Sequence, residues 1–163
     1  MDKLKLLVLV GYGAVGVALA GALVLFVMVA FFTEKGEVKA DPVALGVPVT
    51  GNVEVDKKAL DEAVTAKKNA QKAEIGAGLS DVVFAFFTAV LIVVGLAILR
   101  AKPIAGGLIA VIPGIATLIY YATGPGFAGF RLLFSATWVV AILAALVAFP
   151  AAKKAAINPW DEE

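Results

Sequence analysis

The chain alternates between long apolar stretches and short polar breaks, and this pattern predicts helices that cross a membrane. Four stretches are nearly free of charge and are bounded by charged residues or by Gly and Pro; they cover residues 6–32, 82–99, 104–122 and 127–149. A hydrocarbon core of about 30 Å needs about 17–25 residues of helix, and each stretch reaches that length. The pattern therefore predicts an all-α integral membrane protein with four transmembrane helices.

The first stretch follows a charged start over residues 1–5, so a secretory signal is the alternative to a retained helix. Residues 38–40 weakly resemble a small-residue cleavage site. However, the apolar region of a signal peptide spans about 7–15 residues, and this stretch is much longer. We therefore expect residues 1–32 to form a cytoplasmic N-terminus and a retained transmembrane helix.

Residues 33–80 form a long polar segment whose two halves differ in character. The first half is rich in turn formers and β-branched residues, which favours an extended path or a small hairpin. The second half is rich in Ala, Lys and Glu, which favours one additional helix over about residues 56–74 with Asp56 as its N-cap. The apolar stripe of this helix is thin, so it packs on a partner or on the bundle, or prolongs the second transmembrane helix outward.

Short breaks separate the last three apolar stretches. Residues 101–103 and 123–126 leave room only for tight reversals, so we expect helices two to four, within residues 81–150, to be mutual neighbours. Helix one is joined to them by the long polar segment, which makes it the helix most free to contact another subunit. Residues 151–163 are expected to form a cytoplasmic tail.

The basic residues of the short connections fall on one side of the membrane in this arrangement. They are Lys3, Lys5, Arg100, Lys102, Lys153 and Lys154. Because Lys and Arg are enriched in cytoplasmic loops, both termini are expected in the cytoplasm and residues 33–80 outside it, with Arg131 as the exception. This bias and the modest chain length fit a prokaryotic plasma (inner) membrane.

Composition narrows the chemistry open to the chain. Hydrophobic residues make up 61% and charged residues 17%, against about 25% charged in a soluble domain. A net charge of +1 without a basic face excludes a nucleic-acid partner. The chain has no Cys and no His, so we expect no metal, haem or other cofactor and no enzymatic activity. Residues 11–16 spell Gly-x-Gly-x-x-Gly, but a dinucleotide site needs a preceding strand, and these residues lie inside a predicted span.

Small residues recur at four-residue spacing in two predicted helices, and such ladders let helix backbones approach closely in lipid. The ladders are Ala14, Ala18 and Ala22 in the first helix and Gly106, Ala110 and Gly114 in the third. Packing within the bundle is favoured for the third helix; for the first, internal packing and a partner subunit are equal alternatives. Pro113 predicts a kink in helix three, favoured as a packing feature over an ion path.

Asp81 and Arg131 are the ionisable residues nearest the membrane interior, at the expected starts of helices two and four. We predict an interfacial ion pair, with side chains that reach headgroups and water, and favour a structural role over binding of a headgroup, proton or cation. Aromatic residues gather near the same boundary and fit anchoring, with a groove for a lipid, quinone or pigment as the alternative. They are Phe31, Phe32, Phe84, Phe86, Phe87, Tyr120, Tyr121, Phe127 and Phe130.

These features favour a non-catalytic accessory subunit of a larger membrane protein complex. Its partners would be the lipid bilayer and other membrane subunits, in a hetero- or homo-oligomer, contacted through transmembrane helix faces and residues 33–80. The alternative is a small oligomeric channel or carrier for an ion or small solute, with Pro113, Asp81 and Arg131 along the path. An enzyme acting on lipids is a third hypothesis.

Overall fold

The computed structural model describes residues 3–32, 38–124 and 126–157, which form helices and no strand. The elements are α1 (Lys3–Val27), the π-helical turn η1 (Met28–Phe32), α2 (Val53–Ile98), α3 (Pro103–Thr123) and α4 (Ala128–Ile157). By length and composition, α1 to α4 can each cross a membrane. The prediction of an all-α protein with four potential spans is confirmed.

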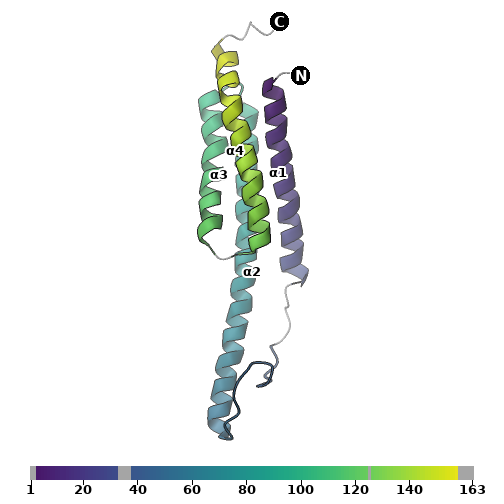
Figure 1. The fold of residues 1–163 in the computed structure, drawn as a ribbon, viewed down its shortest axis with the longest axis vertical. Coiled ribbons are helices and arrows are strands. Elements are labelled where there is room, and N and C mark those ends of the chain that lie inside the picture. Colours follow the sequence, from purple (N-terminus) through teal and green to yellow (C-terminus); the bar gives the residue numbers. More distant parts are fainter. Residues whose placement is uncertain (1–2, 33–37, 125, 158–163) are drawn as a thin grey trace.

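The helices form a bundle in which neighbours along the chain are neighbours in space (Figure 1). Both α1 and α3 pack on α2 and α4, whereas α1 and α3 do not approach each other within the described part. The most extensive pair is α1 with α4, so helix one belongs fully to the bundle and is not held by its connection alone. The diagonal pair α2 and α4 touches at few points, so helices two to four are not all mutual neighbours.

Helix α2 is 46 residues long, which corresponds to about 69 Å, and its first half projects beyond the other helices (Figure 1). The helix expected over about 56–74 is present, but it is not a separate element: those residues are the outer part of α2, which is the outward prolongation of the second transmembrane helix given above as one alternative. Gly76 and Gly78 interrupt the composition there, but a glycine costs only about 1 kcal/mol within a helix and proline is absent from α2. We call residues 53–77 the α2 arm.

The arm enters the bundle at Gly78, where neighbouring side chains come very close. A Cβ atom at this position would lie 2.6 Å from Val29 Cγ2 and 2.8 Å from Phe127 Cε2. The glycine therefore lets α2 pass between the end of α1 and the start of α4.

Asn52 caps the arm, not Asp56 as predicted. The Asn52 side chain accepts hydrogen bonds from the backbone N–H groups of Glu54 and Val55. Asp56 lies in the first turn and reaches back, accepting from Thr50 N at 2.9 Å, Thr50 Oγ1 at 2.6 Å and Gly51 N at 3.1 Å. The two side chains together satisfy donors at the helix start and in the turn before it.

Acidification is expected to loosen this start of α2. Hydrogen bonds from the Thr50 hydroxyl, above all, and from the backbone of Thr50 and Gly51 hold the pKa of the Asp56 carboxyl below its usual 3.8. Because the folded pKa is the lower one, the contribution of the carboxylate to local stability is complete above the unfolded pKa. It is lost as the pH falls through the folded value.

Hydrogen-exchange protection factors of the Thr50 and Gly51 amides should therefore fall below about pH 4, while those in the middle of the bundle stay constant. The variant Asp56→Ala should show the low protection already at neutral pH. Unchanged protection of these two amides in acid, or in the variant, would contradict the assignment.

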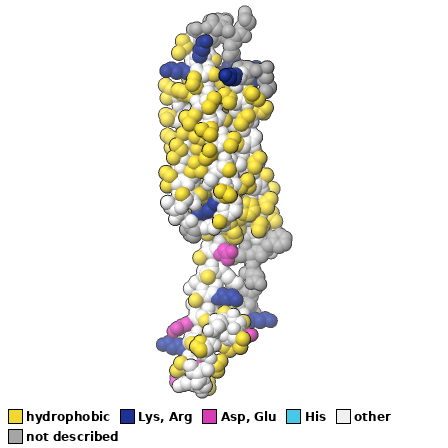
Figure 2. Space-filling model, in the orientation of Figure 1, with side chains coloured by type: hydrophobic (Ala, Val, Ile, Leu, Met, Phe, Trp, Pro, Cys, Tyr) yellow, Lys and Arg dark blue, Asp and Glu magenta, His cyan; other side chains and the backbone are white. Residues whose placement is uncertain are grey.

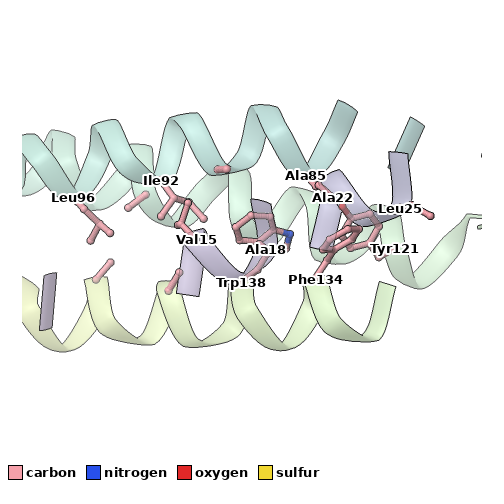
Figure 3. Packing of buried hydrophobic residues seen from close by; sticks show 14 of the residues in the cluster. Val15, Ala18, Ala22, Leu25, Ala85, Ile92, Leu96, Tyr121, Phe134 and Trp138 are labelled. Atoms are coloured by element: carbon pink, nitrogen blue, oxygen red, sulfur yellow. The ribbon is translucent and has the colours of Figure 1, made fainter. Parts of the chain in front are cut away.

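The bundle core combines a few large side chains with many alanines (Figure 3). Trp138 and Phe134 of α4 are fully buried, as are Ile92 of α2 and Leu25 of α1. Among the described residues, the Trp138 indole N–H makes no hydrogen bond of normal geometry. Hydrophobic side chains also cover the outside of the bundle, as expected for helices surrounded by lipid (Figure 2).

Helix α4 continues past the expected boundary at residue 150 and ends at Ile157. Pro150 lies inside it, and the start of the predicted tail is helical. Ala148 and Ala152 are buried against Leu4 and Leu99 in a second small core, and these contacts support the helix on both sides of the proline.

Candidate functional site

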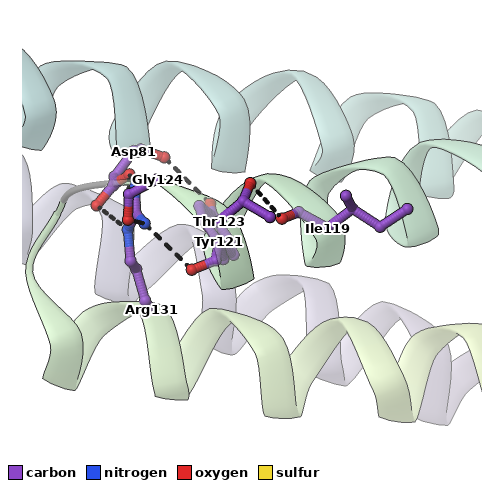
Figure 4. Close-up of polar contacts among 6 residues, drawn as sticks. All are labelled: Asp81, Ile119, Tyr121, Thr123, Gly124 and Arg131. Carbon is purple, nitrogen blue, oxygen red and sulfur yellow. Dashed lines mark hydrogen bonds and ion pairs between the residues drawn. The ribbon is translucent and has the colours of Figure 1, made fainter.

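An ion pair joins α2 to α4 where the arm meets the bundle (Figure 4). Arg131 Nη2 donates to Asp81 Oδ1 at 2.7 Å, and Arg131 Nε donates to Asp81 Oδ2 at 2.9 Å. This two-point geometry gives the strongest form of an arginine–carboxylate contact. Asp81 is 0% exposed and Arg131 is 6% exposed, so the pair is enclosed by protein. We had expected the two side chains to extend towards headgroups and water, and they do not.

The remaining polar groups of this cluster are also paired. Arg131 Nη1 donates to the backbone oxygens of Tyr121, at 3.1 Å, and of Gly124 (Figure 4). The Tyr121 hydroxyl donates to the backbone oxygen of Asp81 at 3.2 Å. The guanidinium also lies over the rings of Tyr120 and Tyr121, 5.1 and 5.5 Å from their centroids, which adds cation–π attraction.

The chain reversal between α3 and α4 wraps closely around this pair. A Cβ atom on Gly126 would collide with Arg131 Nε and Asp81 Oδ2, so a side chain at that position is incompatible with the contact. Asp81 and Arg131 thus tie α2, the C-terminal end of α3 and α4 together at one level. We call this group, with Tyr121 and Gly124, the interhelical clamp.

Within the clamp, the Asp81 carboxylate is occupied by Arg131. A reactive carboxylate needs access to a substrate or proton donor, whereas both Asp81 oxygens accept from Arg131 and the side chain is enclosed. Within the described ranges, no group of three or more acidic residues is placed to hold a metal ion. The clamp is therefore suited to hold helices in register.

The ladder in α3 lies at the crossing with α2. A Cβ on Gly106 would come 2.6 Å from Leu99 Cα, and one on Gly95 would come 2.5 Å from Ala110 N. Gly114 faces both neighbours of α3, with Ile142 Cδ1 of α4 2.7 Å from where its Cβ would lie. The backbones of α2 and α3 are in contact at Gly95 and Gly106 because these glycines have no side chain to separate them.

A second polar contact between α2 and α3 lies near the middle of both apolar stretches. The hydroxyls of Thr88 and Thr117 are hydrogen-bonded to each other, and both residues are buried. Thr117 Oγ1 also donates to the backbone oxygen of Pro113 at 2.9 Å. Such bonding to the preceding turn bends helices and satisfies a carbonyl beside the proline. The kink predicted at Pro113 stays a prediction.

The three alanines of the α1 ladder differ in burial. Ala18 and Ala22 are buried in the core and Ala14 is half-buried. The closest approaches of α1 occur at glycines that the ladder does not include: Gly11 lies against Leu96 of α2, and Gly21 lies against Leu133 and Phe134 of α4. By contrast, Gly13 and Gly16 are exposed, with open space where a Cβ would stand.

The aromatic residues near the clamp form contacts along α2 and α3 and at the start of α4. Phe84 stacks on Tyr120 with ring centroids 4.1 Å apart, and Tyr121 packs against Phe134 at 5.7 Å. Phe86 and Phe87 point outward and are more than half exposed. The side chain of Phe32 lies outside the described residues.

Comparison of the chain with known protein families, with curated proteins and with solved structures gives no significant match. The functional argument therefore proceeds from the geometry of the bundle and of the arm.

Proposed function

We propose that this chain is a non-catalytic structural subunit of a larger membrane protein complex. The observation that carries the proposal is the α2 arm, about 25 residues of polar helix, or about 37 Å, held out from the bundle by a continuous backbone. A helix that was needed only to cross the membrane would end at the membrane boundary. The arm reaches a distance that serves contact with another protein outside the bilayer.

The surface of the arm supports this role. Its charges nearly balance, and pairs such as Lys57 with Asp61 and Lys58 with Glu62 are four residues apart, a spacing that stabilises an isolated helix. The residues on most of its surface are exposed, so the chain itself covers little of the arm. A rigid helix of mixed charge offers a preformed surface to a partner without the entropic cost of ordering a loop.

A second surface lies on α1, facing away from the bundle. Gly13, Gly16 and Ala20 share this exposed side, and small residues there let the helix of another subunit approach closely in lipid. The proposal therefore includes a contact within the membrane as well as one outside it.

The packed interior favours this proposal over a path for an ion or solute through a single chain. Large side chains such as Trp138 and Phe134 fill the bundle, and the buried hydroxyls of Thr88 and Thr117 bond to each other. For orientation, we propose that the basic end faces the cytoplasm of a prokaryotic plasma membrane, which places the arm outside.

The substitution Gly16→Leu is expected to weaken assembly while the isolated chain stays folded, because open space surrounds Gly16. The measurement is the amount of stoichiometric partner that co-purifies with the tagged chain from its native membrane in mild detergent. We expect a loss of severalfold or more, as for bulk introduced into a close helix contact.

The matched control is Gly129→Leu, which adds the same side chain at an open, exposed position on α4 and should leave the partner bound. For the arm, Lys67→Glu together with Lys68→Glu reverses two exposed charges and should lower the same yield. A wild-type chain that migrates as a lone monomer, with no stoichiometric partner, would overturn the proposed function.

A further inference from the structure

A groove of about 260 Å³ runs between α1 and α2 at the basic end of the bundle. Its walls are mostly apolar, with Val8 and Leu9 on α1 and Leu96 on α2. Lys5 and Arg100, both exposed, lie at its outer end. Tyr12 lies at the opposite end, two turns of α1 deeper than Lys5.

The order of chemical groups along this groove matches that of a phospholipid. Lys5 lies in the first turn of α1, and Arg100 follows the end of α2. Both cations therefore lie at the boundary between the apolar bundle and water. One turn further in, Leu9 of α1 and Ala97 of α2 are both exposed and present hydrocarbon surface. A molecule that fills the groove must therefore be charged at the boundary and apolar below it.

Charge complementarity selects an anionic headgroup. Six Lys and Arg residues belong to this end of the bundle, and with the four acidic residues of the adjoining chain termini (Asp2, Asp161, Glu162 and Glu163) counted, cations still exceed anions by two. Figure 2 shows Lys and Arg side chains gathered at this end. Basic pockets between transmembrane helices bind the headgroups of anionic lipids, and each cation near such a surface adds to the attraction.

We propose that one anionic phospholipid binds in this groove, with its phosphate between Lys5 and Arg100 and an acyl chain along Leu9 and Ala97. The lipid would cover the seam between α1 and α2 at the membrane boundary. Leu9 shares a side of α1 with Gly13, Gly16 and Ala20 but lies nearer the basic end of the helix. The lipid is tested on the purified chain alone, so this inference stands without the proposed protein partner.

The test is native mass spectrometry of the purified full chain in detergent, with equal amounts of phosphatidylglycerol and phosphatidylcholine that carry the same acyl chains. We expect the wild type to retain phosphatidylglycerol on the order of tenfold better, because its headgroup is a net anion whereas the choline cation neutralises the phosphate of phosphatidylcholine. The variant Lys5→Gln/Arg100→Gln should lose this preference. The variant Lys153→Gln/Lys154→Gln removes the same charge from exposed positions at the same end and should keep it.

Leu9→Trp tests the apolar part, because Leu9 is 59% exposed and the larger side chain fills the groove while every charge stays. We expect phosphatidylglycerol retention to fall severalfold, with circular dichroism and elution volume unchanged. Three results would each overturn the site: equal loss in both double-charge variants, equal retention of the two lipids by the wild type, or displacement of the lipid by millimolar inorganic phosphate alone.

Discussion

Replacing Arg131 by leucine is expected to lower the free energy of unfolding by about 3–5 kcal/mol, the usual cost of leaving a buried charge without its partner. Asp81 would lose its charged hydrogen bonds with Arg131 inside a fully enclosed site. The backbone oxygens of Tyr121 and Gly124 would lose the donor that they share. Replacing Asp81 by leucine should cost a similar amount, because the guanidinium then stays charged and enclosed.

The double variant Asp81→Leu/Arg131→Leu should be less destabilised than the sum of the two single variants by at least about 1 kcal/mol, because a coupled pair is lost once. Equilibrium unfolding in mixed micelles measures all three variants. The control is Lys153→Leu, which removes an exposed positive charge from the same helix and should change stability by less than about 0.5 kcal/mol. Additive effects in the cycle would show that the two residues act separately and would refute the clamp.

The substitution Gly95→Ala is expected to destabilise the chain by about 1–3 kcal/mol, the cost of overpacking a close contact. Its new methyl group would stand 2.5 Å from Ala110 N and 2.7 Å from Gly106 O, and backbone atoms cannot turn away as a side chain can. Helices α2 and α3 would have to separate, which also stretches the hydrogen bond between Thr88 and Thr117.

The matched control is Gly13→Ala, where nothing lies within 4 Å of the added carbon. There the alanine should be neutral, or stabilising by up to about 1 kcal/mol, because alanine loses less backbone freedom than glycine in a helix. Thermal unfolding of both variants in the same detergent decides the matter. Equal stability of the two would mean that α2 and α3 are not in backbone contact.

Local features of the sequence were enough to predict the helices and their approximate ends. Hydrophobic length alone predicts the four spans, because the bilayer demands about 20 apolar residues from each. The short breaks at 101–103 and 123–126 predict two tight connections, and the structure has both. The continuous α2 was the exception, since Gly76 and Gly78 weaken a helix locally and nothing in the sequence shows whether the helix continues through them.

It was harder to predict which faces of the helices contact one another, because these contacts join residues that are distant in the chain. Asp81 and Arg131 could be suggested as a pair from their expected level in the membrane, but their burial depends on the reversal at Gly126 and on Tyr121. Tyr120 and Tyr121, just before that reversal, were the sequence feature that could have indicated an enclosed polar site. In α1 the glycines at 11 and 21, outside the four-residue ladder, make the closest contacts, and the spacing rule did not identify them.

From its sequence, this chain can be assigned four apolar helices, a polar segment between the first two and a basic end, because hydrophobicity, helix length and charge act residue by residue. Tertiary structure decided which faces meet, that the arm and the second span are one helix, and that Asp81 and Arg131 are enclosed together. Those outcomes depend on close packing, where a single Cβ atom at Gly95 or Gly106 determines whether two backbones can approach, and one at Gly126 would displace the ion pair.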